Sequence, residues 1–152
     1  LLGELNGQPA RKVYQDILHI SDKDIDTQTF KNPLGKMNGQ DVCIISIKDV
    51  QGDKLACYRQ VNDSDVLTLL EVKDFSKVVD DTIQQIRRDF RHVSGVFSIN
   101  CIFRYLFFKQ EHYFDTYLKS MATLGDHAGL IGFGEHYNQQ FVNQTMTCVV
   151  FE

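Results

Sequence analysis

The stretch Gly129-Leu-Ile-Gly-Phe-Gly-Glu-His-Tyr-Asn138, together with the β-rich run 141–151 behind it, decides the expected fold. Glycine is used where φ must be positive, or where another backbone or a ligand comes too close for a Cβ. Gly132 and Gly134 flank one aromatic residue and Glu135 follows at once, a pattern typical of a strand end whose backbone is exposed to a neighbour. Residues 137–140 read as a polar turn. We therefore predict a closing hairpin of strands 128–134 and 141–151, around which the rest of the chain is assembled.

Upstream of this hairpin the pattern predicts one strand between two long helices. Apolar residues recur at helical spacing from Phe75 to Phe90, and Asp74 is suited to cap the N-terminus of that helix. A second helical stripe runs over 102–124 and stops at a glycine. The short apolar run 95–100 between them is expected to be a strand.

The N-terminal half predicts a helix followed by a meander. A first helix starts after Pro9 and ends near residue 19, and residues 21–40 read as an ordered loop. Runs 42–47, 55–61 and 66–72 are strand-like and joined by short turns, so we expect antiparallel neighbours. The predicted fold is α+β: a largely antiparallel or mixed β-sheet with about three helices packed on it.

Composition limits the function classes. At 152 residues the chain is expected to form a single domain, and a net charge of −4 without a Lys/Arg cluster argues against a nucleic-acid surface. No apolar run approaches the roughly 20 residues that span a bilayer, so we expect no membrane insertion. The four cysteines occur in apolar runs or at the end of one, without metal-ligand spacing, which favours packed thiols in a reducing, cytoplasmic setting. The start at Leu1, without Met or a signal peptide, indicates a segment cut from a longer protein.

No catalytic or metal-binding signature emerges from the residues. The five histidines lack HxxxH or HExxH spacing, and 132–134 lacks the rest of a dinucleotide fingerprint, so we expect neither a metal nor a cofactor. Cys101 or Ser98 could act as a nucleophile only beside a base, and packing is the simpler role. Arg104 opens a helix in apolar surroundings and must pair with something. Its partner is either Glu135 or the carboxylate of a small ligand.

An ordered series of motifs runs over nearly the whole chain: Asn6 to Ala10, Tyr14, Phe30, Asn32 to Gly35, Phe97, Ser98, Cys101, Arg104, Gly132 to Glu135 and Asn143 to Thr145. This series resembles the C-terminal half of the FIST domain, a sensory module of signalling proteins that also occurs in some F-box proteins. Residues 1–152 are therefore expected to form one FIST C-like domain.

The resemblance implies an intracellular sensor without enzyme activity that binds a small molecule, an amino acid being the favoured class, and signals to attached output domains. It also implies an N-terminal FIST half as a partner. We expect Arg104 to hold a carboxylate and Glu135 an amine, in a recess formed where the closing hairpin lies beside the strand that enters the long helix. The expected ligand contacts are Cys101, Arg104, Glu135 and Asn143, with Phe133 and Tyr137 as apolar walls.

Two other functions stay open. The chain could be a protein-interaction module that recruits a partner without any small ligand, which a large apolar surface patch would favour. It could also be an enzyme with Cys101 as nucleophile, which requires an accessible thiol beside a histidine or carboxylate.

Overall fold

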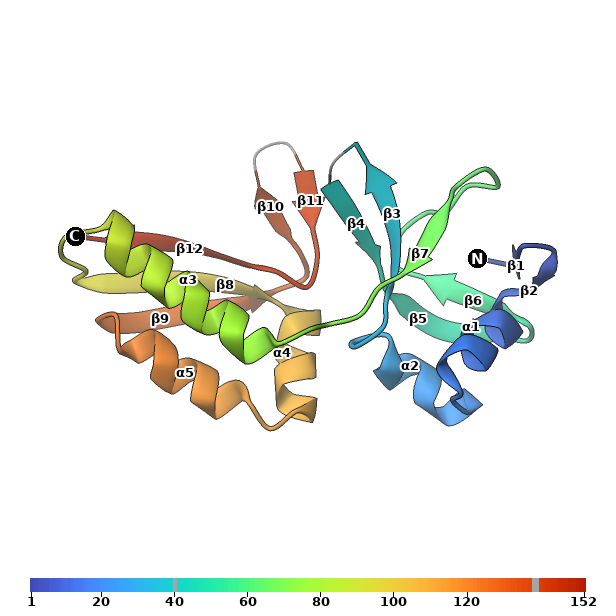
Figure 1. The fold of residues 1–152 in the computed structure, drawn as a ribbon, viewed down its shortest axis with the longest axis horizontal. Coiled ribbons are helices and arrows are strands. Elements are labelled where there is room, and N and C mark those ends of the chain that lie inside the picture. The colour runs from blue at the N-terminus through green and yellow to red at the C-terminus, as the bar shows by residue number, and fades with distance from the viewer. Residues whose placement is uncertain (40, 138–139) are drawn as a thin grey trace. The chain divides into compact units, whose positions relative to one another are not determined.

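The computed structural model describes residues 1–39, 41–137 and 140–152. These residues form two compact units, residues 1–72 and 73–152, each described by itself. Both contain helices and strands, and the sheets are antiparallel except for one mixed sheet in the second unit (Figure 1). The predicted α+β class with a mixed sheet is confirmed.

Unit 1 opens with a tight hairpin. Strands β1 (Glu4–Leu5) and β2 (Gln8–Pro9) pair across Asn6 and Gly7, which have φ of 52° and 74°. Positive φ at both central residues defines a type I′ turn, for which Asn-Gly is the preferred sequence. The remaining elements are α1 (Ala10–Leu18), a short 3₁₀ turn (Asp22–Asp24), α2 (Ile25–Gln28), β3 (Leu34–Asn38), β4 (Asp41–Ile45), β5 (Ile47–Gln51), β6 (Lys54–Cys57) and β7 (Leu67–Leu69).

The predicted meander of unit 1 is wrong in its strand order. β3 lies between β4 and β7, whereas β5 pairs with β6 in a separate two-stranded sheet. Sequence analysis missed β3 because Pro33 and Gly35 made this segment look like a loop. Gly35 instead makes room for the Leu70 side chain, whose Cδ1 would stand 2.7 Å from an added Cβ. The run 42–47 divides at the buried Ser46 into β4 and β5.

Unit 2 is built on a three-stranded sheet with β8 in the middle. β8 (Gly95–Cys101) pairs antiparallel with β12 (Met146–Phe151) and parallel with β9 (Asp126–Gly132). The other elements are α3 (Phe75–Asp89), α4 (Ile102–Gln110), α5 (Phe114–Ala122), β10 (Glu135–Tyr137) and β11 (Gln140–Val142). The carboxylate of Asp74 accepts a hydrogen bond of 2.9 Å from the backbone N–H of Lys77, as expected for the N-cap of α3.

Helices cover one face of this sheet. α3 and α5 lie side by side on the same face (Figure 1), and Val96, Ser98 and Asn100 of β8 point into that interface, at 5% exposure or less. The core consists of the residues buried between these layers: Val79, Ile83, Ile86, Val96, Cys101, Phe107, Phe108, Tyr117, Met121 and Leu124.

Two predictions for unit 2 are wrong. The single helix over 102–124 is two helices, because His112 adopts a left-handed φ of 53° between α4 and α5. The predicted hairpin of 128–134 with 141–151 does not form, because both strands pair with β8 instead of with each other. A smaller hairpin, β10–β11, connects them. The expectation that both segments lie beside the strand entering the helix is confirmed.

Within the described residues, no helix is long and apolar enough to cross a membrane. All four cysteines are free thiols, as predicted, and Cys101 is fully buried.

Candidate functional site

Two of the predicted contact residues, Cys101 and Arg104, lie at the junction between the carboxyl end of β8 and α4. Cys101 ends this strand and precedes α4, and its backbone N–H donates to the carbonyl of Thr145 at 3.1 Å. Gly132 of β9 lies opposite Cys101 in the parallel register. Because the Cys101 side chain is buried with 0% exposure, the structure supports packing for this thiol and not the accessible nucleophile of the enzyme alternative.

Arg104 lies in the first turn of α4 with its guanidinium largely enclosed. Its Nη1 donates to the Oδ1 of Asn100. The guanidinium carbon stands 4.4 Å from the ring centroid of Phe108 and 4.8 Å from that of Tyr117, within cation–π range. Burial lowers the pKa of Arg104, and the nearby Tyr117 hydroxyl and Glu135 carboxylate oppose that effect.

Glu135 is the least expected charge in unit 2, because its side chain is only 3% exposed. One carboxylate oxygen accepts a hydrogen bond of 2.6 Å from the Thr145 hydroxyl. The other, Oε1, is buried without a hydrogen-bond partner among the described residues. Burial raises the pKa of Glu135, whereas the Thr145 hydrogen bond and the positive charge of Arg104 lower it.

The Arg104 guanidinium and the Glu135 carboxyl, predicted to share a recess, act on each other's pKa as opposite charges do, but within the described residues they form no ion pair. Asn143 is also buried, at 8% exposure, in the turn before β12. Phe133 does not enclose them, because it is 89% exposed and points to solvent. The Tyr137 side chain falls outside the described residues. Ligand contact by these residues stays a prediction.

Glu135→Gln is expected to remove a pH-dependent destabilisation. A carboxyl whose folded-state pKa is raised favours folding while protonated, so its contribution is present below the ordinary value of 4.5 and is lost as pH rises through the folded value. Urea unfolding at pH 4.5 and pH 8 should therefore show wild type losing stability relative to the variant as pH rises. Glu152→Gln, at an exposed position, is the control and should show no such trend. A wild-type advantage that grows with pH would contradict the assignment.

A second polar group lines a groove between α5 and β9. The groove has a volume of about 190 Å³, and Ser98, Asn100, Tyr117 and His127 contribute its polar groups. Ser98 Oγ is 2.9 Å from His127 Nε2, and Asn100 Nδ2 is 3.1 Å from the Tyr117 hydroxyl and 3.3 Å from Ser98 Oγ. Burial lowers the pKa of His127, which favours the neutral ring. Asn100 connects this network to Arg104.

Gly129 makes this network possible. It pairs with Ser98 across the parallel ladder. A Cβ on Gly129 would overlap the Ser98 carbonyl oxygen and stand 2.7 Å from Ser98 Oγ, so only glycine allows the two backbones to approach here.

Asn100, Tyr117 and His127 were not predicted as site residues. The alternation in β8 indicates the opposite arrangement, because a strand normally buries its apolar residues and exposes its polar ones. The structure instead buries Ser98 and Asn100 and leaves Phe97 36% exposed. Two polar residues on a buried face must be paired with each other or with a ligand.

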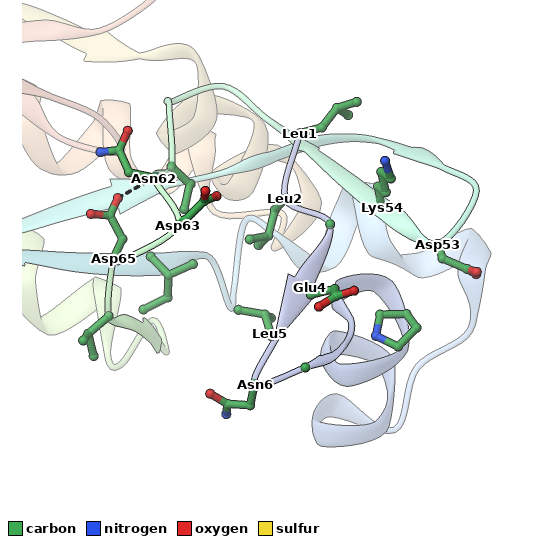
Figure 2. A pocket seen from close by; sticks show the side chains of 16 residues that line it. Leu1, Leu2, Glu4, Leu5, Asn6, Asp53, Lys54, Asn62, Asp63 and Asp65 are labelled. Atoms are coloured by element: carbon green, nitrogen blue, oxygen red, sulfur yellow. Dashed lines mark hydrogen bonds between the residues drawn. The ribbon is translucent and has the colours of Figure 1, made fainter.

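Unit 1 holds a larger hollow of about 950 Å³, shown in Figure 2. The N-terminal hairpin contributes Leu2 and Leu5, and the segment 61–67 contributes Asp63 and Asp65. The carboxylate of Asp65 is already held by Lys36 and by the backbone N–H of Asn62. None of the predicted contact residues lines this hollow, and we place no function there.

Unit 2 thus combines a buried carboxyl, an enclosed guanidinium and a groove lined by polar side chains. In the described part of the chain, no three His, Cys, Asp or Glu side chains are placed to hold a metal ion. The family model described as the FIST C domain matches residues 10–138. The chain therefore belongs to the FIST C family, a family of sensory domains in signalling proteins. No curated protein and no solved structure matches it. The match crosses the boundary between the two units, and a single domain over residues 1–152 stays a prediction.

Proposed function

We propose that this chain is a cytoplasmic sensory domain that binds a small ligand, an amino acid being the first class to test, and passes the signal to attached output domains. It acts by binding and not by catalysis. The observation that carries the proposal is the buried Glu135 carboxylate, one oxygen of which has no hydrogen-bond partner among the described residues, together with the enclosed Arg104 guanidinium, whose positive charge lowers the pKa of that carboxyl. Opposite charges of this kind suit the amine and the carboxylate of one small zwitterion.

Burial strengthens the proposal because isolated charges are costly inside a protein. Oε1 of Glu135 lacks a hydrogen-bond partner among the described residues, and leaving a buried acceptor unpaired costs about 1–3 kcal/mol. A ligand amine at this oxygen would recover that cost. The N-terminal FIST half implied by the family would complete the enclosure.

A thermal-shift screen of amino acids tests the proposal. A ligand that binds only the folded state stabilises it by about 2.7 kcal/mol at a concentration 100 times its Kd, so the shift should grow with ligand concentration. The screen should include the decarboxylated amine and the deaminated acid of each hit, which we expect to bind more weakly. Absence of any shift, with a longer chain that includes the N-terminal FIST half, would contradict the proposal.

A second candidate function has its own observation. The sheet face of unit 2 that points away from the helices exposes apolar side chains: Phe97, Leu130, Val149 and Phe151 are between 36% and 56% exposed. An uncovered apolar face favours contact with another protein surface. A complex with a separately produced N-terminal FIST half that Val149→Glu abolishes, without any stabilising small molecule, would support a partner-recruiting module instead.

A further inference from the structure

In the groove between α5 and β9, the direction of each hydrogen bond around Asn100 follows from which groups can donate and which can accept. A guanidinium only donates, so the group of Asn100 that faces Arg104 is its carbonyl oxygen. Both hydrogens of the Asn100 amide then point to the hydroxyl oxygens of Ser98 and Tyr117. Each hydroxyl thus accepts from Asn100 and keeps one hydrogen to donate.

The two hydroxyl hydrogens do not have equally good acceptors. Ser98 Oγ is 2.9 Å from Nε2 of the His127 ring, and the tautomer of the neutral ring decides which of the two donates. The Tyr117 hydroxyl has Ser98 Oγ as an acceptor at 3.5 Å, beyond the usual O–H···O range of about 2.5–3.0 Å. Tyr117 is 1% exposed, so water outside the protein does not satisfy it. Within the described residues, a buried hydroxyl donor therefore lines the groove without a well-placed acceptor.

The groove also lacks negative charge. Its lining contains no Asp or Glu among the described residues, and the positive charge of Arg104 lies directly behind Asn100. The rest of the lining is apolar, with Phe114 and Leu118 from α5. A volume of about 190 Å³ corresponds to roughly six water molecules at about 30 Å³ each, which limits the ligand to a few non-hydrogen atoms.

We infer that this groove binds a small monocarboxylate of two to four carbons, whose carboxylate accepts from the Tyr117 hydroxyl and whose short apolar tail rests against Phe114 and Leu118. The inference rests on the proposed function in assigning ligand binding to unit 2, but it places the ligand at a different site and removes the need for an amine. The link through Asn100 to Arg104 joins this groove to the region of Glu135.

The test is a ¹H–¹⁵N NMR titration of the whole chain with acetate, propionate and butyrate at constant ionic strength. The reporters are the Asn100 side-chain amide and the backbone amides of Gly129 and Leu130. We expect saturable shifts with a Kd of roughly 1 mM or tighter, and no saturable shift with the uncharged propionamide. Tyr117→Phe should weaken propionate binding at least tenfold. Tyr105→Phe, an equivalent change on α4 that does not line the groove, should leave it unchanged.

A second variant keeps the test decisive should Tyr117→Phe fold poorly. Leu118→Trp, at a position 39% exposed, fills the groove without touching the polar network and should abolish the shifts. The inference is overturned if no reporter moves up to about 10 mM propionate, or if both variants bind as wild type does.

Parallel titration with glycine and alanine separates this inference from the proposed function. Suppose that amino acids shift only the resonances of residues around Glu135 and Thr145, and that no ligand shifts the groove reporters. This result would overturn the inference that the groove binds a monocarboxylate but would leave the sensory proposal standing. No response to any acid or amino acid, including in the longer chain, would remove both.

Discussion

Gly129→Ala is expected to destabilise unit 2 by at least about 3 kcal/mol, the upper part of the range for overpacking. The added Cβ would overlap the carbonyl oxygen of Ser98, a backbone atom that cannot rotate away. The central strand pair β8–β9 would have to separate to accommodate it, which also distorts the groove. Urea unfolding followed by circular dichroism measures the change.

Gly132→Ala is the matched control on the same strand. Its Cβ would stand 3.4 Å from Ile99 Cγ2 and 3.6 Å from the carbonyl oxygen of Gly134, which are ordinary van der Waals contacts. The free energy of unfolding of Gly132→Ala should stay within about 0.5 kcal/mol of the wild-type value. If the two variants are equally stable, the β8 and β9 backbones do not approach each other as closely at Ser98 and Gly129 as described.

Arg104→Met is expected to lower the free energy of unfolding by about 2–4 kcal/mol. It is also expected to abolish ligand-induced stabilisation. The change leaves the buried Oδ1 of Asn100 without its donor and removes a cation from the faces of Phe108 and Tyr117. Methionine keeps most of the side-chain volume, so the loss reports the guanidinium more than a cavity.

Two controls accompany the Arg104 variant. Arg88→Met removes an arginine from the exposed side of α3, where its guanidinium donates to Gln85 Oε1, and the stability change should be near zero. Arg104→Lys keeps the positive charge but not the planar pair of donors, so we expect it to lose less stability and less ligand-induced stabilisation than Arg104→Met does. Wild-type stability of Arg104→Met would contradict the network as described.

The sequence predicted the elements of unit 2 better than their pairing. Local signals suffice for a helix such as α3, because Asp74 caps it and its apolar residues repeat at helical spacing. Strand partners depend on contacts far apart in the chain. Residues 128–134 and 141–151 look like a hairpin locally, but each gains a longer partner in β8, and the intervening Glu135–Val142 segment pairs with itself.

The candidate site was predicted in part. Arg104 and Glu135 could be singled out because a charge in an apolar setting requires a partner. Their approach follows from β9 and β12 flanking β8. Tyr117 falls within the helical stripe predicted over 102–124 and its ring does pack in the core, but only the structure shows its hydroxyl beside Asn100. The break at His112 also has no clear local signal, because positive φ is uncommon for residues other than glycine, even though histidine adopts it more often than most.

The central claim is that unit 2 holds an amino acid through the charge of Arg104. Isothermal titration calorimetry with an amino-acid panel, run on wild type and on Arg104→Met under conditions where both are folded, tests it most directly. We predict saturable heat for at least one ligand with wild type and none with the variant. Equal binding to both proteins, or no binding to a wild-type chain that includes the N-terminal FIST half, would contradict the claim.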